Sequence, residues 1–235
     1  MSVDPKMVQK VLSSKIMQLN NIIADIDGLL TKMETNFFRV SIFGSARMKA
    51  DTPMYHMVCE LAYELALRNC DIVTGGGPGL MEASNKGAKM VAGHKSRSIG
   101  LPIQLHTFEG GPNPHLDVKR EHRRFSSRLD EFMRISHAVI VTPGGIGTIL
   151  ELFYTWQLLQ VHHIEPRPII FLGDMWPELI EWMRKWPLTE KLMSDTDFHP
   201  ITVCQTVEEV LTALDPVMLA FQERKVAGYQ RNHSL

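Results

Sequence analysis

Short apolar segments that do not alternate with polar residues constrain the fold of this chain most. They are VSIF at 40–43, VIV at 139–141 and PIIFL at 168–172. A strand that is apolar on both faces fits a sheet covered by helices on both sides. Segments with helical periodicity lie between these strands, and such alternation indicates right-handed βαβ units. We therefore expect an α/β protein with a Rossmann-like doubly wound parallel sheet flanked by helices.

The same patterns locate six strands and six helices. The strands are expected at 39–44, 71–75, 98–102, 138–142, 168–172 and 201–204. The helices are expected at roughly 53–69, 79–92, 118–136, 147–161, 175–185 and 206–222. Residues 103–117, IQLHTFEGGPNPHLD, form a long loop rich in Gly, Pro and Asn. Long loops in compact domains are often binding loops or lids.

The order of these signals divides the 235 residues into three parts. In residues 1–36 apolar side chains recur at steps of three and four, which predicts a helical extension packed on the core or on a partner subunit. Residues 37–225 carry all the expected strands and are expected to form a single Rossmann-like domain. Residues 226–235 are polar and are expected to be a frayed tail.

The composition argues against several classes of partner. The net charge is −1 and the pI about 6.8, so neither nucleic acid nor an anionic membrane is expected to bind. The three scattered cysteines form no CxxC pair or disulfide framework. The first residues, MSVDPKMVQKVLSSK, lack the apolar core of a signal peptide. A soluble cytoplasmic protein is the resulting expectation.

Glycine-rich turns follow three of the expected strands, at the strand ends where parallel sheets bind ligands. They are Gly44-Ser45, GGGPG at 75–79 and PGGIGT at 143–148. Glycine lets backbone N–H groups approach an anion, and the dipole of the following helix adds about 0.3–2 kcal/mol. Tight turns alone would also explain the glycines. Their repetition at three strand ends favours a phosphate-bearing ligand.

Several familiar motifs are missing from the sequence. GxxxxGK[ST] does not occur, and GGGPGL at 75–80 has Leu80 where a dinucleotide fingerprint needs its last glycine. No acidic residue follows the next strand end, at 100–102, to bind a ribose. The ten histidines show no HExxH or similar ligand spacing, so no metal is expected. A mononucleotide or sugar phosphate is therefore favoured over NAD, and no cofactor is expected.

A single carboxylate lies in the apolar segment after the third turn. Glu151 is the only charged residue between Ile146 and Val161. It follows Thr148 by three positions, which places it one helical turn below the start of the helix. A surface glutamate that complements the helix dipole is the simpler interpretation. The apolar surroundings instead favour a buried carboxylate close to whatever is attached to the phosphate.

A buried carboxylate needs a cation, and residues 118–136 carry six basic side chains. At 100° per residue, Phe125, Leu129, Phe132 and Ile135 define an inward arc. Arg128 falls inside this arc, whereas the other basic residues are more typical of a solvated face. Arg128 is therefore the arginine expected to reach the site.

Three segments stand out in the chain: VSIFGSARMKADTPMYHMVCELAYELA, VTGGGPGLMEASNKGA and PGGIGTILE. Together they resemble the Lonely guy (LOG) family, which is also called possible lysine decarboxylase, and the resemblance runs from about 38 to 214. The motif PGGxGTxxE is met at every fixed position, and the family's catalytic pair falls on Arg128 and Glu151. The family usually has lysine where this chain has Leu129. The N-terminal extension is similar to longer bacterial members rather than to the short plant type.

The resemblance implies a phosphoribohydrolase that converts AMP or a cytokinin riboside 5′-monophosphate into free base and ribose 5-phosphate. Residues 37–225 would then be the nucleotide-binding catalytic domain of a homodimer. The substrate-binding residues implied, with the last two as weaker candidates near the base, are Gly44, Ser45, Gly76, Gly77, Gly144, Gly145, Gly147, Thr148, Met81 and Asn85.

Two other functions are consistent with parts of the pattern. A nucleotide carrier, such as a molybdenum-cofactor carrier, would use similar glycine turns but has no need of an arginine–glutamate pair. A lysine decarboxylase needs a Schiff-base lysine, and none lies in the three glycine turns.

Overall fold

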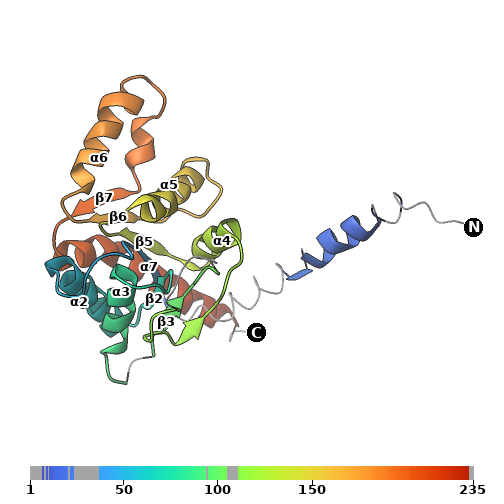
Figure 1. The fold of residues 1–235 in the computed structure, drawn as a ribbon, viewed down its shortest axis with the longest axis horizontal. Coiled ribbons are helices and arrows are strands. Elements are labelled where there is room, and N and C mark those ends of the chain that lie inside the picture. Colours follow the sequence, from blue (N-terminus) through green and yellow to red (C-terminus); the bar gives the residue numbers. More distant parts are fainter. Residues whose placement is uncertain are drawn as a thin grey trace, which may run out of the picture. The chain divides into compact units, whose positions relative to one another are not determined.

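The computed structural model describes residues 7, 9, 11–20, 22–23, 37–93, 95–104 and 111–232. The chain separates into two units, Met1–Asn36 and Phe37–Leu235. In the first unit, residues 11–20 and 22–23 are helical (Figure 1). The second unit contains the sheet and its helices. No described helix combines the length and the apolar character that crossing a membrane requires.

The described part of the second unit contains a seven-stranded sheet. Its strands are β1 (Arg39–Phe43), β2 (Asp71–Thr74), β3 (Ser98–Gly100), β4 (Val118–Lys119), β5 (Ala138–Val141), β6 (Ile169–Leu172) and β7 (Ile201–Cys204). The spatial order is β4-β3-β2-β1-β5-β6-β7, and every pairing is parallel. Five strands are buried at every position: β1, β2, β3, β5 and β6. The expectation of an α/β fold with a parallel sheet is confirmed.

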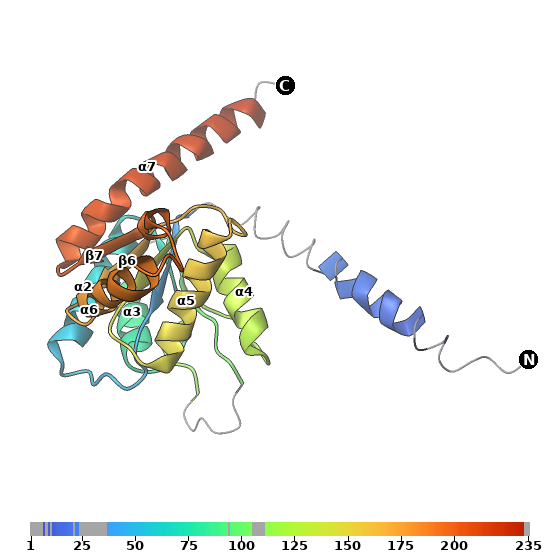
Figure 2. The ribbon, with the colours of Figure 1, turned by 90° about the horizontal axis from the view of Figure 1, so that it is seen from above.

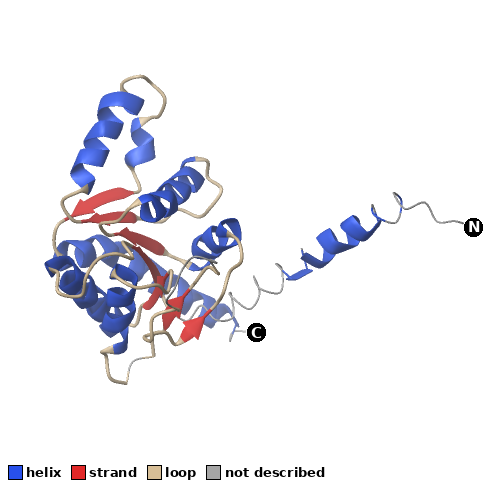
Figure 3. Cartoon of the chain, viewed as in Figure 1, coloured by secondary structure: helices blue, strands red, loops and turns tan. Residues whose placement is uncertain are grey.

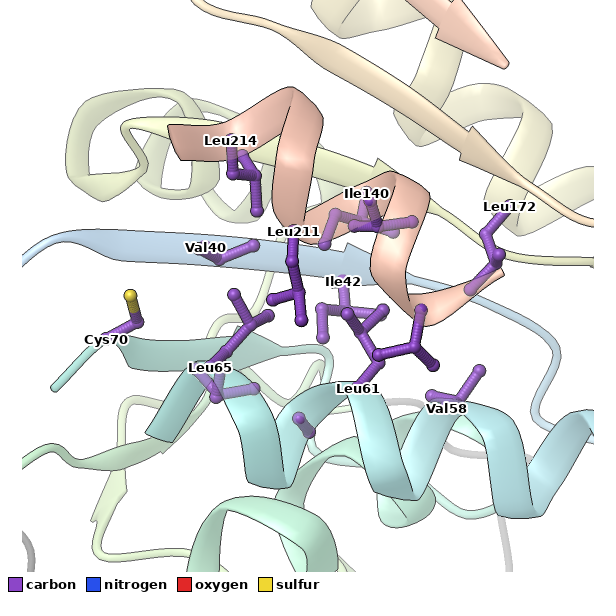
Figure 4. Packing of buried hydrophobic residues seen from close by; sticks show 14 of the residues in the cluster. Val40, Ile42, Val58, Leu61, Leu65, Cys70, Ile140, Leu172, Leu211 and Leu214 are labelled. Atoms are coloured by element: carbon purple, nitrogen blue, oxygen red, sulfur yellow. The ribbon is translucent and has the colours of Figure 1, made fainter. Parts of the chain in front are cut away.

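Helices cover both faces of the sheet (Figure 3). They are α2 (Pro53–Leu67), α3 (Leu80–Lys89), α4 (Phe125–Ile135), α5 (Ile146–Gln160), α6 (Trp176–Met183), the short helices η1 (Arg184–Leu188) and η2 (Asp195–Phe198), and α7 (Val207–Asn232). On one face α2, α3 and α7 bury Val40 and Ile42 of β1 beneath residues such as Leu61 and Leu211 (Figure 4). On the other face α4, α5 and α6 pack over Phe43 and Val141.

Two expected elements differ in the structure. The segment expected as one helix at 118–136 contains the strand β4, and α4 begins only at Phe125 because Arg124 has an extended backbone. Phe125, expected to face inward, is 48% exposed as the first residue of α4, whereas Leu129, Phe132 and Ile135 are buried. The expected polar tail begins inside α7, which continues to Asn232. Of the expected loop at 103–117, residues 105–110 lie outside the described residues.

The strand order reverses next to β1, and this reversal positions the candidate site. From β1 the chain proceeds outward through β2, β3 and β4, and β5 then returns to the opposite side of β1. In doubly wound sheets a crevice opens where neighbouring strands lead in opposite directions. Here the carboxyl ends of β1 and β5 lead into Gly44-Ser45 and the 143–148 turn. Helices α4 and α5 lie side by side near this end (Figure 2).

Candidate active site

The turn between β5 and α5 is joined to the turn after β1. The backbone N–H of Ser45 donates to the carbonyl oxygen of Pro143 at 3.0 Å. Gly145 is the N-cap of α5 and has no side chain with which to cap the helix. The first N–H groups of a helix have no partner within the helix itself. This end of α5 therefore presents donors and a positive dipole end at the carboxyl end of β5.

The glycines of this turn serve different physical purposes. A Cβ atom at Gly144 would lie 2.1 Å from Oγ1 of Thr148, so this glycine makes room for the buried threonine. No described atom lies within 4 Å of a Cβ built at Gly145 or Gly147, and both residues are exposed. The space above the start of α5 is thus open to a ligand. Gly44 lies deeper, because a Cβ there would lie 2.2 Å from Oγ1 of Thr142.

The turn after β2 is held by a buried network of polar side chains. The side-chain oxygen of Asn85 accepts from Oγ1 of Thr74 at 2.7 Å and from Nδ2 of Asn113 at 2.9 Å. Nδ2 of Asn113 also donates to the carbonyl oxygen of Gly77. The backbone N–H of Asn113 donates to the carbonyl oxygen of Gly76. Asn85 is fully buried, so the structure places it under the turn rather than on an open surface. It connects the glycine turn to residues 111–117.

Arg128 and Glu151 form an ion pair between α4 and α5. Nη2 of Arg128 lies 3.2 Å from Oε1 of Glu151, and both side chains are about nine-tenths buried. Nε of Arg128 donates to the carbonyl oxygen of Leu101 at 2.8 Å. The guanidinium carbon lies 5.4 Å from the ring centre of Phe132. These three contacts fix the guanidinium, so the structure brings together the two residues that the helical pattern had selected.

The environment of Glu151 raises its pKa from 4.5 to about 7. Burial is the larger cause, because a carboxylate in an apolar surrounding loses its hydration. The charge of Arg128 opposes this effect and lowers the pKa. Near pH 7 the carboxyl group is therefore able to exist in both protonation states, as a group that exchanges protons during a reaction must.

This pKa makes the stability of the fold depend on pH. Since one pKa unit corresponds to about 1.4 kcal/mol, ionising Glu151 costs the folded state about 3 kcal/mol. The folded protein holds this proton more tightly than the unfolded chain. The stabilisation of the folded state by protonated Glu151 is therefore complete below pH 4.5, and it is lost as the pH rises through about 7.

We expect chemical denaturation at pH 5 and pH 8.5 to show this loss in the wild type. In Glu151→Gln, which has no proton to lose, the loss should be smaller by about 3 kcal/mol. Equal pH dependence in both proteins would contradict a raised pKa at Glu151.

Gly75 is a site residue that the sequence did not single out from the other glycines of its turn. A Cβ atom there would lie 2.2 Å from Nη2 of Arg128 and 2.7 Å from Sδ of Met81. Gly75 thus leaves the space that the guanidinium occupies, and Met81 packs beside it. Only the three-dimensional structure shows which glycine of the turn contacts the arginine, because the connection spans α4 and the end of β2.

We expect Gly75→Ala to fold normally but to displace the guanidinium of Arg128. The atom that a Cβ would strike is the far end of a flexible side chain, so the arginine can move at little cost in stability. The change should leave the melting temperature within a few degrees and lower any activity that depends on the Arg128–Glu151 pair by about tenfold or more. Differential scanning fluorimetry and turnover measurements test this. Full activity in Gly75→Ala would show that the position of the guanidinium is not critical.

The fold and this site define a Rossmann-like α/β protein in which the start of a helix, open above its first turn, lies near a buried arginine–glutamate pair. The family described as "Possible lysine decarboxylase" matches residues 81–214, more than half of the chain. The chain belongs to this family, and the resemblance to the LOG proteins is confirmed.

Two curated relatives show how far the similarity extends. A pyrimidine/purine nucleotide 5′-monophosphate nucleosidase of Escherichia coli (strain K12) is 39% identical over 118 residues, which are 47% of this chain. That match spans only 26% of the relative's length. A cytokinin riboside 5′-monophosphate phosphoribohydrolase of Arabidopsis thaliana is 27% identical over 192 residues, covering 79% of this chain and 85% of the relative.

Solved structures share the fold. The molybdenum cofactor carrier protein from Chlamydomonas reinhardtii aligns with a TM-score of 0.60 at 18% identity, covering 78% of this chain and 99% of that one. The molybdenum cofactor binding protein from Rippkaea orientalis aligns with a TM-score of 0.57 at 18% identity, over 79% and 99% of the two chains. At this identity the likeness is one of fold.

Proposed function

We propose that this protein is a nucleoside 5′-monophosphate phosphoribohydrolase. It would hydrolyse the N-glycosidic bond of AMP or of a cytokinin riboside 5′-monophosphate, giving free base and ribose 5-phosphate. The observation that carries this proposal is the buried ion pair of Arg128 and Glu151, one helical turn below an open helix end. The names of the two curated relatives, a nucleosidase and a phosphoribohydrolase, support the same reaction class.

The 5′-phosphate would bind at the start of α5. Gly145 and Gly147 leave open space there, and Thr148 contributes a hydroxyl group from the first turn. Gly44, Ser45 and the glycine turn at 75–79 would border the nucleotide from β1 and β2. A phosphate at this place is stabilised by the helix dipole and by backbone donors. Its binding energy would hold the ribose against the side chain of Glu151.

Glu151 would act in its ionised form. The carboxylate stabilises the positive charge that develops on the ribose as the bond to the base breaks, and it accepts a proton from the attacking water. The water oxygen bonds to C1′, the electrons of the C1′–N bond pass to the base, and the base takes up a proton. Arg128 would position Glu151 and the nucleotide through the fork of its guanidinium.

The assay for this proposal is incubation with AMP followed by chromatographic separation of the products. We expect adenine and ribose 5-phosphate in equal amounts. Adenosine with inorganic phosphate would indicate a phosphatase instead. A panel of purine, prenylated purine and pyrimidine monophosphates, scored by kcat/KM for released base, then identifies the preferred base.

A carrier that binds a nucleotide-like cofactor without turnover is the principal alternative, since two structural neighbours carry or bind the molybdenum cofactor. Binding of AMP without any product would favour this alternative. The ion pair argues against it, because a carrier has no reaction for which a buried carboxylate with a pKa near 7 is needed.

We also expect the catalytic domain to form a homodimer in the cytoplasm. Helix α5 exposes Ile146 and Leu150, and Val161 just beyond it is also exposed. Exposed apolar side chains that gather on one element often mark a protein contact. Light scattering at micromolar concentration tests this, and a mass of 26.7 kDa, that of one chain, would contradict it.

A further inference from the structure

The helix in the first unit exposes a continuous apolar face. Residues 11–20 and 22–23 are helical (Figure 1). Leu12, Ile16, Leu19 and Ile23 are between 54% and 58% exposed. Lys15 is the only charged residue from 11 to 23. A helix this short is marginal in water on its own, and this one has few charges to keep it dissolved. The exposed face therefore needs a partner.

The spacing of the apolar residues indicates what kind of partner fits. The steps from Leu12 to Ile16, Leu19 and Ile23 are four, three and four. The sequence continues this alternation at Ile26, Leu30 and Met33, so the six steps from Leu12 to Met33 span 21 residues, a repeat of 3.5. A repeat of 3.5 residues keeps one seam facing a neighbouring helix with the same repeat, as in a coiled coil. A sheet or an irregular surface would not require this period.

The described surface of the second unit offers no matching stripe. Its exposed large apolar side chains are scattered over several elements, and the two pairs at helical spacing are Ile146 with Leu150 and Trp182 with Trp186. Leu219 is the one large apolar side chain that is exposed among the described residues of helix α7. Among the exposed side chains of the described residues, a run of four apolar residues at steps of three and four occurs only in residues 12–23. The face is therefore complementary to a second copy of itself.

We propose that residues 12–23 pair with the same residues of a second copy of this chain as a coiled coil. Leu12, Ile16, Leu19 and Ile23 form its seam. This contact is separate from the surface of α5 and does not depend on the proposed activity. If the catalytic domains also dimerise, the coiled coil joins such dimers into a larger assembly.

The test compares the mass in solution of the full-length chain with that of three variants, by light scattering at the same concentration. Leu19→Glu/Ile23→Glu places charges in the seam and should reduce the mass by about half. Leu19→Ile/Ile23→Leu keeps the seam apolar and should retain the wild-type mass. Ser14→Glu/Gln18→Glu adds the same charge outside the seam and should also retain it.

Masses that differ from these expectations would overturn the proposal. A wild-type mass of one chain, or an unchanged mass in Leu19→Glu/Ile23→Glu, would show that the seam holds no second copy. The same loss in Ser14→Glu/Gln18→Glu would show that added charge, rather than the seam, is responsible. Circular dichroism and the melting temperature of the second unit identify any variant whose fold has changed, and release of base from AMP reports separately on the proposed activity.

Discussion

Glu151→Gln is expected to lower the rate of base release by about 10²–10⁴, the usual contribution of one acid–base group. Glutamine keeps the size of the side chain and can still accept a hydrogen bond from Arg128. It cannot take a proton from water or place a negative charge beside the ribose. Because the proposed phosphate site lies elsewhere, at the start of α5, the affinity for AMP should change by less than about tenfold. Single-turnover assays and calorimetric titration measure the two quantities separately.

The matched control is Glu131→Gln, because Glu131 lies on α4 and pairs with Arg120 and Arg134 rather than with Arg128. This variant should keep the rate within a few-fold of the wild type. A Glu151→Gln enzyme with near wild-type turnover, or equal losses in the two variants, would show that the carboxylate of Glu151 takes no part in the reaction.

Arg128→Met is expected to have the second-largest effect, a loss of about 10² or more in kcat/KM. It removes the donor to Glu151 and the contact with the carbonyl oxygen of Leu101. It also leaves the buried carboxyl group without its counter-charge, so the pKa of Glu151 should rise further. The pH at which activity reaches half its maximum should therefore move from about 7 to a more alkaline value.

Arg128→Lys separates charge from geometry. Lysine retains the positive charge, so the pH midpoint should stay closer to that of the wild type. A single ammonium group cannot reproduce the fork that reaches both Glu151 and Leu101, so the maximal rate should still fall. A pH–rate profile of all three proteins tests this pair of effects. An unshifted midpoint in Arg128→Met would show that the arginine does not control the ionisation of Glu151.

The fold was predictable where burial imposes a pattern on the sequence. Strands β5 and β6 are apolar at every position and β1 at three of five because helices cover both faces, and this produced the segments VSIF, VIV and PIIFL. Strand β4 was missed because Val118 and Lys119 lie at the sheet edge, half-buried and exposed, where no such pattern arises. The start of α4 was misplaced for a related reason, since the basic residues before Phe125 suit a helix surface as well as an extended segment.

The candidate site was predictable in part. Arg128 and Glu151 could be selected because a charged residue on an apolar helical face is costly without a partner. Periodicity along one helix could not show that Gly75 makes room for the guanidinium, or that Asn85 and Asn113 hold the glycine turn from below. These contacts join β2, α3, α4 and the segment at 111–117. They depend on the order of strands in the sheet, which local sequence does not determine.

The most direct test of the central claim is a crystal structure of Glu151→Gln with AMP bound. We expect the 5′-phosphate at the backbone N–H groups of 145–148, with C1′ of the ribose facing the side chain at 151 and the guanidinium of Arg128 beside them. A nucleotide whose sugar lies far from residue 151, with Arg128 turned toward solvent, would contradict the proposed hydrolysis.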